Sequence, residues 1–174
     1  LMDQLTCISR ARQLITKLNI TTFPVDVAAI AADQSFEIKE SDLLADDEAG
    51  NTFVKNGRKI ITVNKNDDPF RRRFTILHEI AHHALGLPSK HGEKLASSEL
   101  ERVGTRPPEE VLCDVFAAEC LVPSHLIQPL TDQFPFTAAT IQDLSDRFEA
   151  SKQCVASRFA RSSRDLLAYV FSES

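Results

Sequence analysis

Apolar residues recur every three or four positions near the start of the chain. In residues 3–18, one apolar side chain falls at each of these steps: Leu5, Ile8, Ala11, Ile15 and Leu18. At 3.6 residues per turn they share one face of a helix. The pattern therefore predicts an amphipathic helix over residues 3–18, and residues 24–32 predict a second, shorter one.

Two short stretches rich in β-branched residues flank the pair Asn56-Gly57. They cover residues 52–55 and 58–63. Asn-Gly suits a type I′ turn, in which both central residues take positive φ, so the two stretches predict a hairpin. Residues 35–39 predict a further strand. We expect a small antiparallel sheet, with one hairpin strand forming an edge that can hold an extended peptide by main-chain pairing.

Helix start and stop residues delimit two longer helices. Asp68 can cap the first and Pro69 suits its first turn, while Gly86 ends it. An apolar stripe runs along it: Phe74, Leu77, Ala81 and Leu85. The second helix is predicted from Pro108 to Leu121, with Pro123 beyond its end.

The last part of the chain has a different pattern. Residues 141–159 resemble a helix-turn-helix in which Ser151 caps the second helix. That helix carries several basic residues, but acidic residues balance them over the whole segment, so packing or protein contact is favoured over direct DNA binding. We expect residues 1–135 to form one domain and residues 136–174 a helical segment packed on the same core.

Composition narrows the class of protein. The chain has 174 residues, of which 43% are hydrophobic and 26% charged, and its net charge is −5. These values predict one globular core with no general attraction to nucleic acid. The absence of a long apolar run and of a signal-peptide pattern predicts a cytoplasmic protein with no membrane partner. Its four cysteines lack metal-knuckle spacing and are expected to be buried thiols.

The stretch His78-Glu79-Ile80-Ala81-His82 carries the chemistry. It is the H-E-x-x-H arrangement in which two imidazoles four residues apart face one Zn²⁺ ion. Glu79 lies about 100° round the helix, from where its carboxylate can act as general base on a water held at the ion. Two buried core histidines are the alternative explanation of the pair.

A catalytic zinc site needs a third protein ligand. Glu110 and Asp114 are four residues apart on the second long helix, so they share a face. Glu110 is the predicted ligand, and Asp114 is predicted to accept the free N–H of a ligand histidine. Glu109 takes the place of Glu110 if the helical phase is off by one. His125 and Tyr169 are candidate stabilisers of the transition state, although no spacing fixes their positions.

These residues also support a resemblance. The run R-F-T-I-L-H-E-I-A-H at residues 73–82 and the run E-V-L-C-D-V-F-A-A-E-C-L-V-P at residues 110–123 resemble the ImmA/IrrE family of metallopeptidases. In that family, R-F-T-x-x-H-E-x-x-H is followed by E-x-x-A-N-x-F-A-A-E-L-L-M-P. The departures are Cys113, Asp114, Cys120 and Val122, and none removes a ligand.

The resemblance implies that His78, His82 and Glu110 hold Zn²⁺ and that Glu79 is the base. It also implies that the substrate is a repressor or another transcription regulator. We therefore expect an α+β, mostly helical zincin-like metallopeptidase with a helix-turn-helix-like C-terminal segment. Two other functions stay open: a zinc-containing module that sequesters a regulator without cutting it, and a DNA-binding regulator acting through its C-terminal helices.

Overall fold

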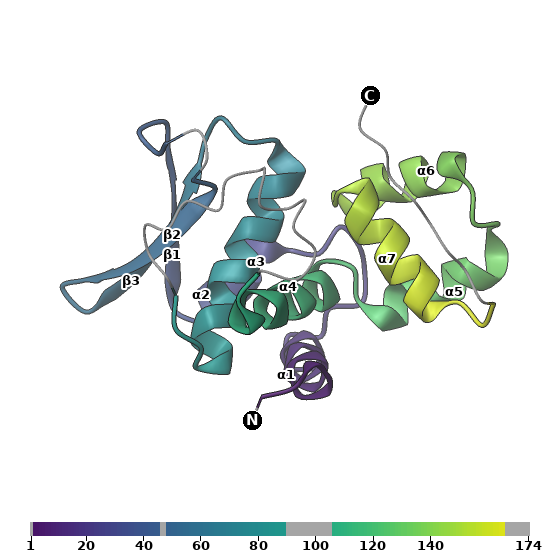
Figure 1. Cartoon of the computed structure of the whole chain (residues 1–174), viewed down its shortest axis with the longest axis horizontal. Coiled ribbons are helices and arrows are strands. Elements are labelled where there is room, and N and C mark those ends of the chain that lie inside the picture. Colours follow the sequence, from purple (N-terminus) through teal and green to yellow (C-terminus); the bar gives the residue numbers. More distant parts are fainter. Residues whose placement is uncertain (1, 46–47, 90–105, 166–174) are drawn as a thin grey trace.

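The computed structural model describes residues 2–45, 48–89 and 106–165. Over these ranges seven helices and three strands form an α+β fold, as the sequence predicts (Figure 1). The helices are α1 (Gln4–Lys17), α2 (Val27–Asp33), α3 (Pro69–Leu85), α4 (Pro108–Leu121), α5 (Ser124–Gln133), α6 (Ala138–Phe148) and α7 (Lys152–Ser162). The strands are β1 (Phe36–Ser41), β2 (Gly50–Lys55) and β3 (Arg58–Asn64).

The sheet is mixed rather than antiparallel, which corrects one expectation. The strand order is β1-β3-β2. The hairpin of β2 and β3 is antiparallel as predicted, with φ of 52° at Asn56 and 76° at Gly57. However, β1 pairs in parallel with β3. β3 carries the buried side chains Ile61 and Val63 and is the most apolar of the three strands. It lies at the centre of the sheet, where β1 and β2 flank it on both edges.

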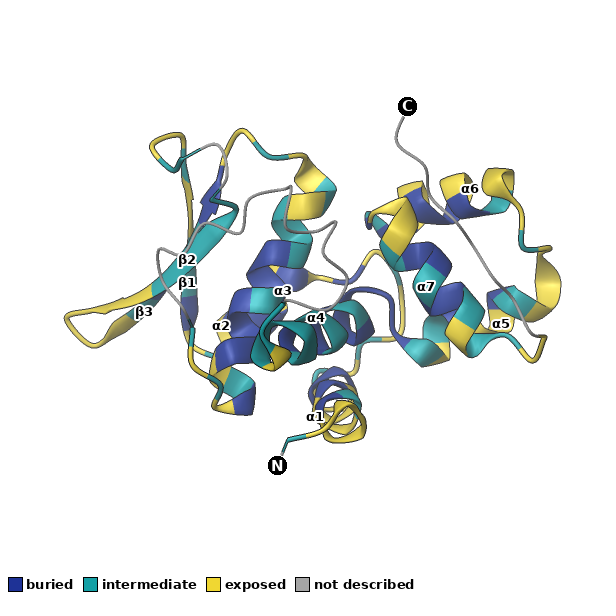
Figure 2. Ribbon diagram, viewed as in Figure 1, coloured by how far each residue is buried: buried dark blue, intermediate teal, exposed yellow. Residues whose placement is uncertain are grey.

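Helices cover one face of the sheet. α2 and α3 pack against the strands, α4 packs against α3, and α1 packs against α4. The buried residues of these elements line up on their facing sides (Figure 2). The caps of α3 follow the sequence prediction: the Asp68 carboxylate accepts from the amides of Phe70 and Arg71, and Gly86 has φ of 65°. This fixes where the H-E-x-x-H turn lies relative to the strands.

The three C-terminal helices pack on one another, since α7 contacts both α5 and α6. α6 and α7 form the predicted helix pair, and the Ser151 hydroxyl caps α7 by accepting from the amide of Cys154. The sequence pattern did not predict α5, which contains Pro129. Buried residues from α1 to α7 belong to one hydrophobic cluster. The domain division at residue 135 stays a prediction.

Two arginines tie the C-terminal helices to the rest. Arg73 of α3 donates to the carbonyl oxygens of Val25 and Glu149, at 2.7 and 3.1 Å. Arg158 of α7 donates to the carbonyl oxygen of Val122 at 3.0 Å and pairs with the buried Glu119 of α4. Each link joins a C-terminal element to one of the two helices that carry the predicted metal ligands.

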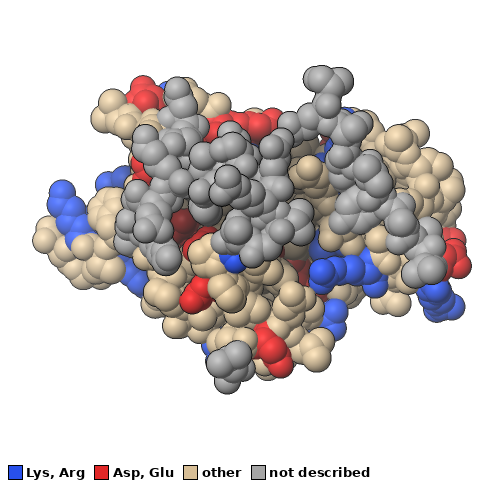
Figure 3. Space-filling view, in the orientation of Figure 1, with Lys and Arg blue, Asp and Glu red and all other residues tan. Residues whose placement is uncertain are grey.

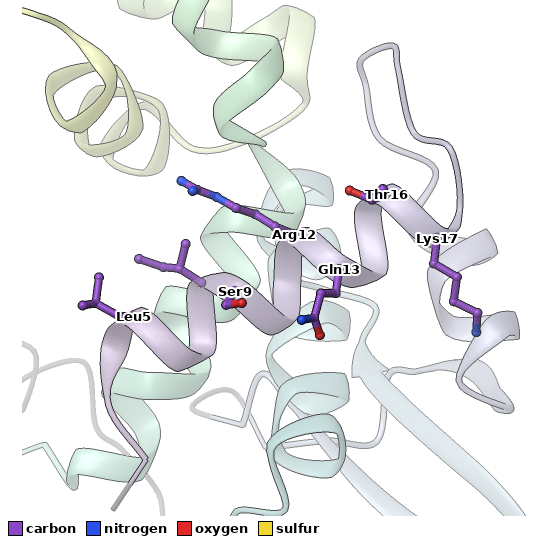
Figure 4. A pocket seen from close by; sticks show the side chains of 7 residues that line it. Leu5, Ser9, Arg12, Gln13, Thr16 and Lys17 are labelled. Atoms are coloured by element: carbon purple, nitrogen blue, oxygen red, sulfur yellow. The ribbon is translucent and has the colours of Figure 1, made fainter.

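A hollow lies along α1, the helix that packs against α4. It has a volume of about 580 Å³ and is lined by α1 residues alone, among them Leu5, Arg12 and Lys17 (Figure 4). None of the predicted site residues lines it. On the face in view, small groups of Lys and Arg and small groups of Asp and Glu are scattered among the other residues (Figure 3). Among the helices of the described ranges, none is long and apolar enough to span a bilayer.

Candidate metal centre

Three predicted ligands meet where α3 packs on α4. The Nε2 atoms of His78 and His82 lie 3.2 Å apart. Glu110, in the first turn of α4, places Oε2 3.0 Å from Nε2 of His78 and Oε1 3.4 Å from Nε2 of His82. One donor atom from each residue therefore lies within 4.8 Å of the other two. Glu110, and not Glu109, occupies this position.

The spacing of the donor atoms fits a zinc ion. Two ligands at about 2.0–2.1 Å from a tetrahedral Zn²⁺ lie about 3.3 Å apart. The two histidine Nε2 atoms are 3.2 Å apart, and each oxygen of Glu110 lies beside a different ring, Oε2 3.0 Å from Nε2 of His78 and Oε1 3.4 Å from Nε2 of His82. Two imidazoles and one carboxylate are also a ligand set that a catalytic zinc site uses. Chemistry and geometry therefore agree that these residues can hold the ion.

Asp114 is hydrogen-bonded to one of the two histidines. Its Oδ1 lies 2.8 Å from Nδ1 of His78, so a neutral His78 donates its N–H there and leaves the Nε2 lone pair facing His82 and Glu110. The other oxygen, Oδ2, accepts from Arg106. Nδ1 of His82 is buried and has no hydrogen-bond partner among the described residues, so the two rings are held differently.

The cluster favours positive charge. Burial lowers the pKa of His78, but hydrogen bonds to Asp114 and Glu110 outweigh burial and raise that pKa to about 9. The pKa of Glu110 is lowered, mainly by its hydrogen bonds to His78 and His82. Without a metal, a proton is therefore held between these groups at neutral pH. A bound metal cation can replace that proton, because the same carboxylates stabilise its positive charge.

Glu79 lies beside the cluster and not within it. The residue is buried, with 8% of its surface exposed, and its Oε2 accepts from the Thr52 hydroxyl of β2 at 2.6 Å. Sequence reasoning placed a hairpin strand next to the cleft but did not single out Thr52 or Arg106. The available hints were the position of Thr52 at the start of the predicted hairpin and of Arg106 four residues before Glu110.

Of the two candidate stabilisers, His125 is not brought to the cluster. Nε2 of His125 bonds the carbonyl oxygen of Ile20 at 2.8 Å. His125 follows the end of α4, and the helical rise puts that end about 16 Å from Glu110. Tyr169 lies outside the described residues. His83, the neighbour of His82, points away from the cluster: its Nε2 lies 2.8 Å from Nζ of Lys59.

Comparison with known proteins decides the family. Residues 31–160 match the peptidase family described as the IrrE N-terminal-like domain, a span that holds both metal helices. The chain belongs to this family of metallopeptidases. This confirms the resemblance drawn from the two sequence runs.

Two relatives of this IrrE-like chain are radiation response metalloproteases named IrrE. The one from Deinococcus deserti is 34% identical over 96 residues, which cover 53% of this chain and 32% of the relative. The one from Deinococcus radiodurans is 33% identical over 96 residues, which cover 53% and 28%. The matched region thus spans only about a third of either relative.

A solved structure shares the fold of this IrrE-like chain. It is described as a Mycobacterium tuberculosis transcriptional regulator and superimposes with a TM-score of 0.65 at 18% identity. The superposition covers 88% of this chain and 46% of the other. At this identity the likeness concerns the fold alone. It supports the α+β arrangement described above.

Proposed function

We propose that the chain is a zinc-dependent endopeptidase. The observation that carries this is the convergence of donor atoms from His78, His82 and Glu110 within 4.8 Å, with Glu79 next to His78 in the chain. Family membership supports a divalent metal, and the imidazole-rich ligand set favours zinc over magnesium or calcium, which prefer oxygen ligands. A site that served structure alone needs no general base at position 79.

In the proposed reaction each residue has one task. Zn²⁺ held by the three ligands would polarise the scissile carbonyl and make a water more acidic. Glu79 takes a proton from the attacking water and passes it to the nitrogen of the leaving amine. Asp114 keeps the His78 ring in the orientation that presents Nε2. The buried surroundings of Glu79 limit competing water.

We propose a protein substrate, namely a repressor or another transcription regulator. The names of the Deinococcus relatives, which describe response metalloproteases, support a regulatory proteolysis of this kind. β2 supplies the means to hold such a substrate, because it is an edge strand of the sheet and its Thr52 touches Glu79. An extended segment pairing with β2 would lie beside the base.

We further propose that residues 136–174 contact that partner and not DNA, and that the protein acts in the cytoplasm. All four cysteines are free thiols, as expected in a reducing compartment. A salt-dependent gel shift on non-specific duplex DNA checks the first point. Strong binding that weakens steeply with salt would instead favour a DNA-binding regulator.

The test of the activity uses Glu79→Gln. Glutamine keeps the size of the side chain but cannot accept the proton. The assay uses cells that co-express the regulator proposed as the substrate. We expect the variant to keep its zinc, to bind the regulator and to cleave it about 10² to 10³ times more slowly. Equal loss of the full-length regulator with both proteins would contradict the proposal. Inactivation without cleavage would favour the sequestering module.

A further inference from the structure

β2 runs beside α3, and residues two apart on the strand contact residues four apart on the helix. Gly50 lies against Thr75, and Thr52 bonds Glu79. One step further, Val54 pairs across the hairpin with Lys59, whose Nζ lies 2.8 Å from Nε2 of His83. Steps of four residues on a helix and two on a strand both advance about 6–7 Å. β2 therefore meets α3 at two successive turns, at Thr75 and Glu79, and the contact one turn further, at His83, comes from Lys59 of β3.

We propose that Thr52 is a positioning residue for the general base and that Gly50 makes its contact with Glu79 possible. The inference rests on the proposed role of Glu79. Thr52 Oγ1 donates to Oε2 of Glu79 at 2.6 Å, which occupies one oxygen of the carboxylate. The hydrogen bond fixes the plane of the carboxylate and leaves Oε1 to take the proton.

Gly50 sets the distance between the strand and the helix. A Cβ atom there would lie 2.7 Å from Cγ2 of Thr75 and 2.8 Å from the carbonyl oxygen of Thr62. The second contact is with backbone of the central strand, which cannot move aside cheaply. Any larger residue at position 50 pushes β2 away from α3. Because Thr52 is two residues further on the same face, its hydroxyl moves with the strand.

The arrangement couples substrate and base. β2 is the edge at which we place the substrate backbone, and it also holds the carboxylate that must face the scissile bond. A shift of the strand therefore moves the substrate and the base together. Holding the base from the strand, and not from α3 alone, keeps their relative positions constant.

The test needs no substrate. The metal-free chain is loaded with Co²⁺, whose visible absorption reports its ligands, and is titrated with acetohydroxamate. A hydroxamic acid chelates a metal through two oxygens after giving up its proton, and a neighbouring carboxylate accepts that proton and stabilises the complex. Six proteins are compared: wild type, Glu79→Gln, Thr52→Val, Thr52→Ser, Gly50→Ala and Phe53→Ala. Valine keeps the shape of threonine without the hydroxyl, and serine keeps the hydroxyl.

We expect Thr52→Val to bind acetohydroxamate about three- to tenfold more weakly, the loss of one hydrogen bond. Thr52→Ser should bind like wild type. Phe53→Ala should also bind like wild type, because this neighbour points to the opposite face of β2 and is 43% exposed. Gly50→Ala should match Thr52→Val in hydroxamate affinity while keeping Co²⁺.

The outcomes separate this inference from the proposed function. Equal affinity of wild type and Glu79→Gln would show that the base does not face the metal, which overturns both. A weaker Glu79→Gln with an unchanged Thr52→Val would overturn only the role of Thr52. Equal weakening in Thr52→Val and Thr52→Ser would also overturn it, since the effect would then come from packing and not from the hydroxyl.

Discussion

α4 carries two carboxylates that face opposite ways, Glu110, which is partly buried, and Glu119, which is buried. Glu110 and Glu119 are nine residues apart, and at 100° per residue this places them on opposite sides of the helix. Glu110 turns toward α3 and its two histidines. Glu119, 1% exposed, turns toward α1 and α7, where it meets Arg12 and Arg158.

The partners of the two carboxylates differ in their permanent charge. Glu119 is neutralised by two guanidinium groups and also accepts from the Ser124 hydroxyl at 2.9 Å. Glu110 faces two imidazoles, which are neutral when they bind a metal. A buried acid satisfied by arginine is a structural element, because its charge is already balanced. Glu110, whose partners in the described part of the chain are the two histidines, has room for a cation, and this contrast distinguishes the two sites.

The largest expected effect is loss of the metal. Purified protein should hold about one Zn²⁺ per chain, and His78→Ala with His82→Ala should hold none, because one carboxylate is too weak a site. Glu110→Gln should strip most of the zinc as well. Atomic absorption measures the content. Glu119→Gln is the matched control on the same helix and should keep its zinc wherever it stays folded. Loss of zinc in folded Glu119→Gln with full zinc in Glu110→Gln would contradict the distinction between the two carboxylates.

The second effect concerns stability. Arg158→Ala leaves the buried Glu119 without its main partner, so urea unfolding should show a loss of about 3–5 kcal/mol. Arg12 meets the same carboxylate but is 58% exposed at its side chain. Arg12→Ala should therefore cost less than about 1 kcal/mol. Similar losses of unfolding free energy in Arg158→Ala and Arg12→Ala would mean that burial does not set the strength of the ion pairs with Glu119.

The third effect is the pH dependence of metal binding. The pKa of His78 is raised to about 9 in the metal-free protein, so below pH 9 the metal must displace a proton. Zinc affinity should fall about tenfold for each pH unit between 8 and 6 from this group alone. Without metal the sign reverses: the stabilisation from protonated His78 is full below pH 6.5 and is lost as pH rises toward 9. Competition with a chelator and apo-protein thermal unfolding measure the two trends.

The smallest effect comes from the residue behind the ligand. Asp114→Ala should weaken zinc binding about ten- to a hundredfold without unfolding the chain. Asp114→Asn should be milder, because its amide oxygen still accepts the N–H of His78. Chelator competition again gives the affinity. An unchanged value in Asp114→Ala would reduce the carboxylate to a partner of Arg106 alone.

Most secondary structure followed from local pattern. α1, α3 and α4 begin and end within a residue or two of the predicted limits, since caps, prolines and apolar spacing act over a few neighbours. α5 was missed because Pro129 argues locally against a helix, whereas packing on α7 supports it. β1 was expected in an antiparallel sheet because sequence alone does not say which hairpin strand it joins.

The candidate site divides in the same way. The sequence by itself determined that His78 and His82 share a helical face and that Glu110 and Asp114 share another, because the period of a helix is local. Only the tertiary structure decided that these faces meet, that Glu110 and not Glu109 completes the cluster, and that Thr52 holds Glu79. Contacts between residues 27 or more positions apart depend on how whole elements pack, and no short-range pattern encodes that distance.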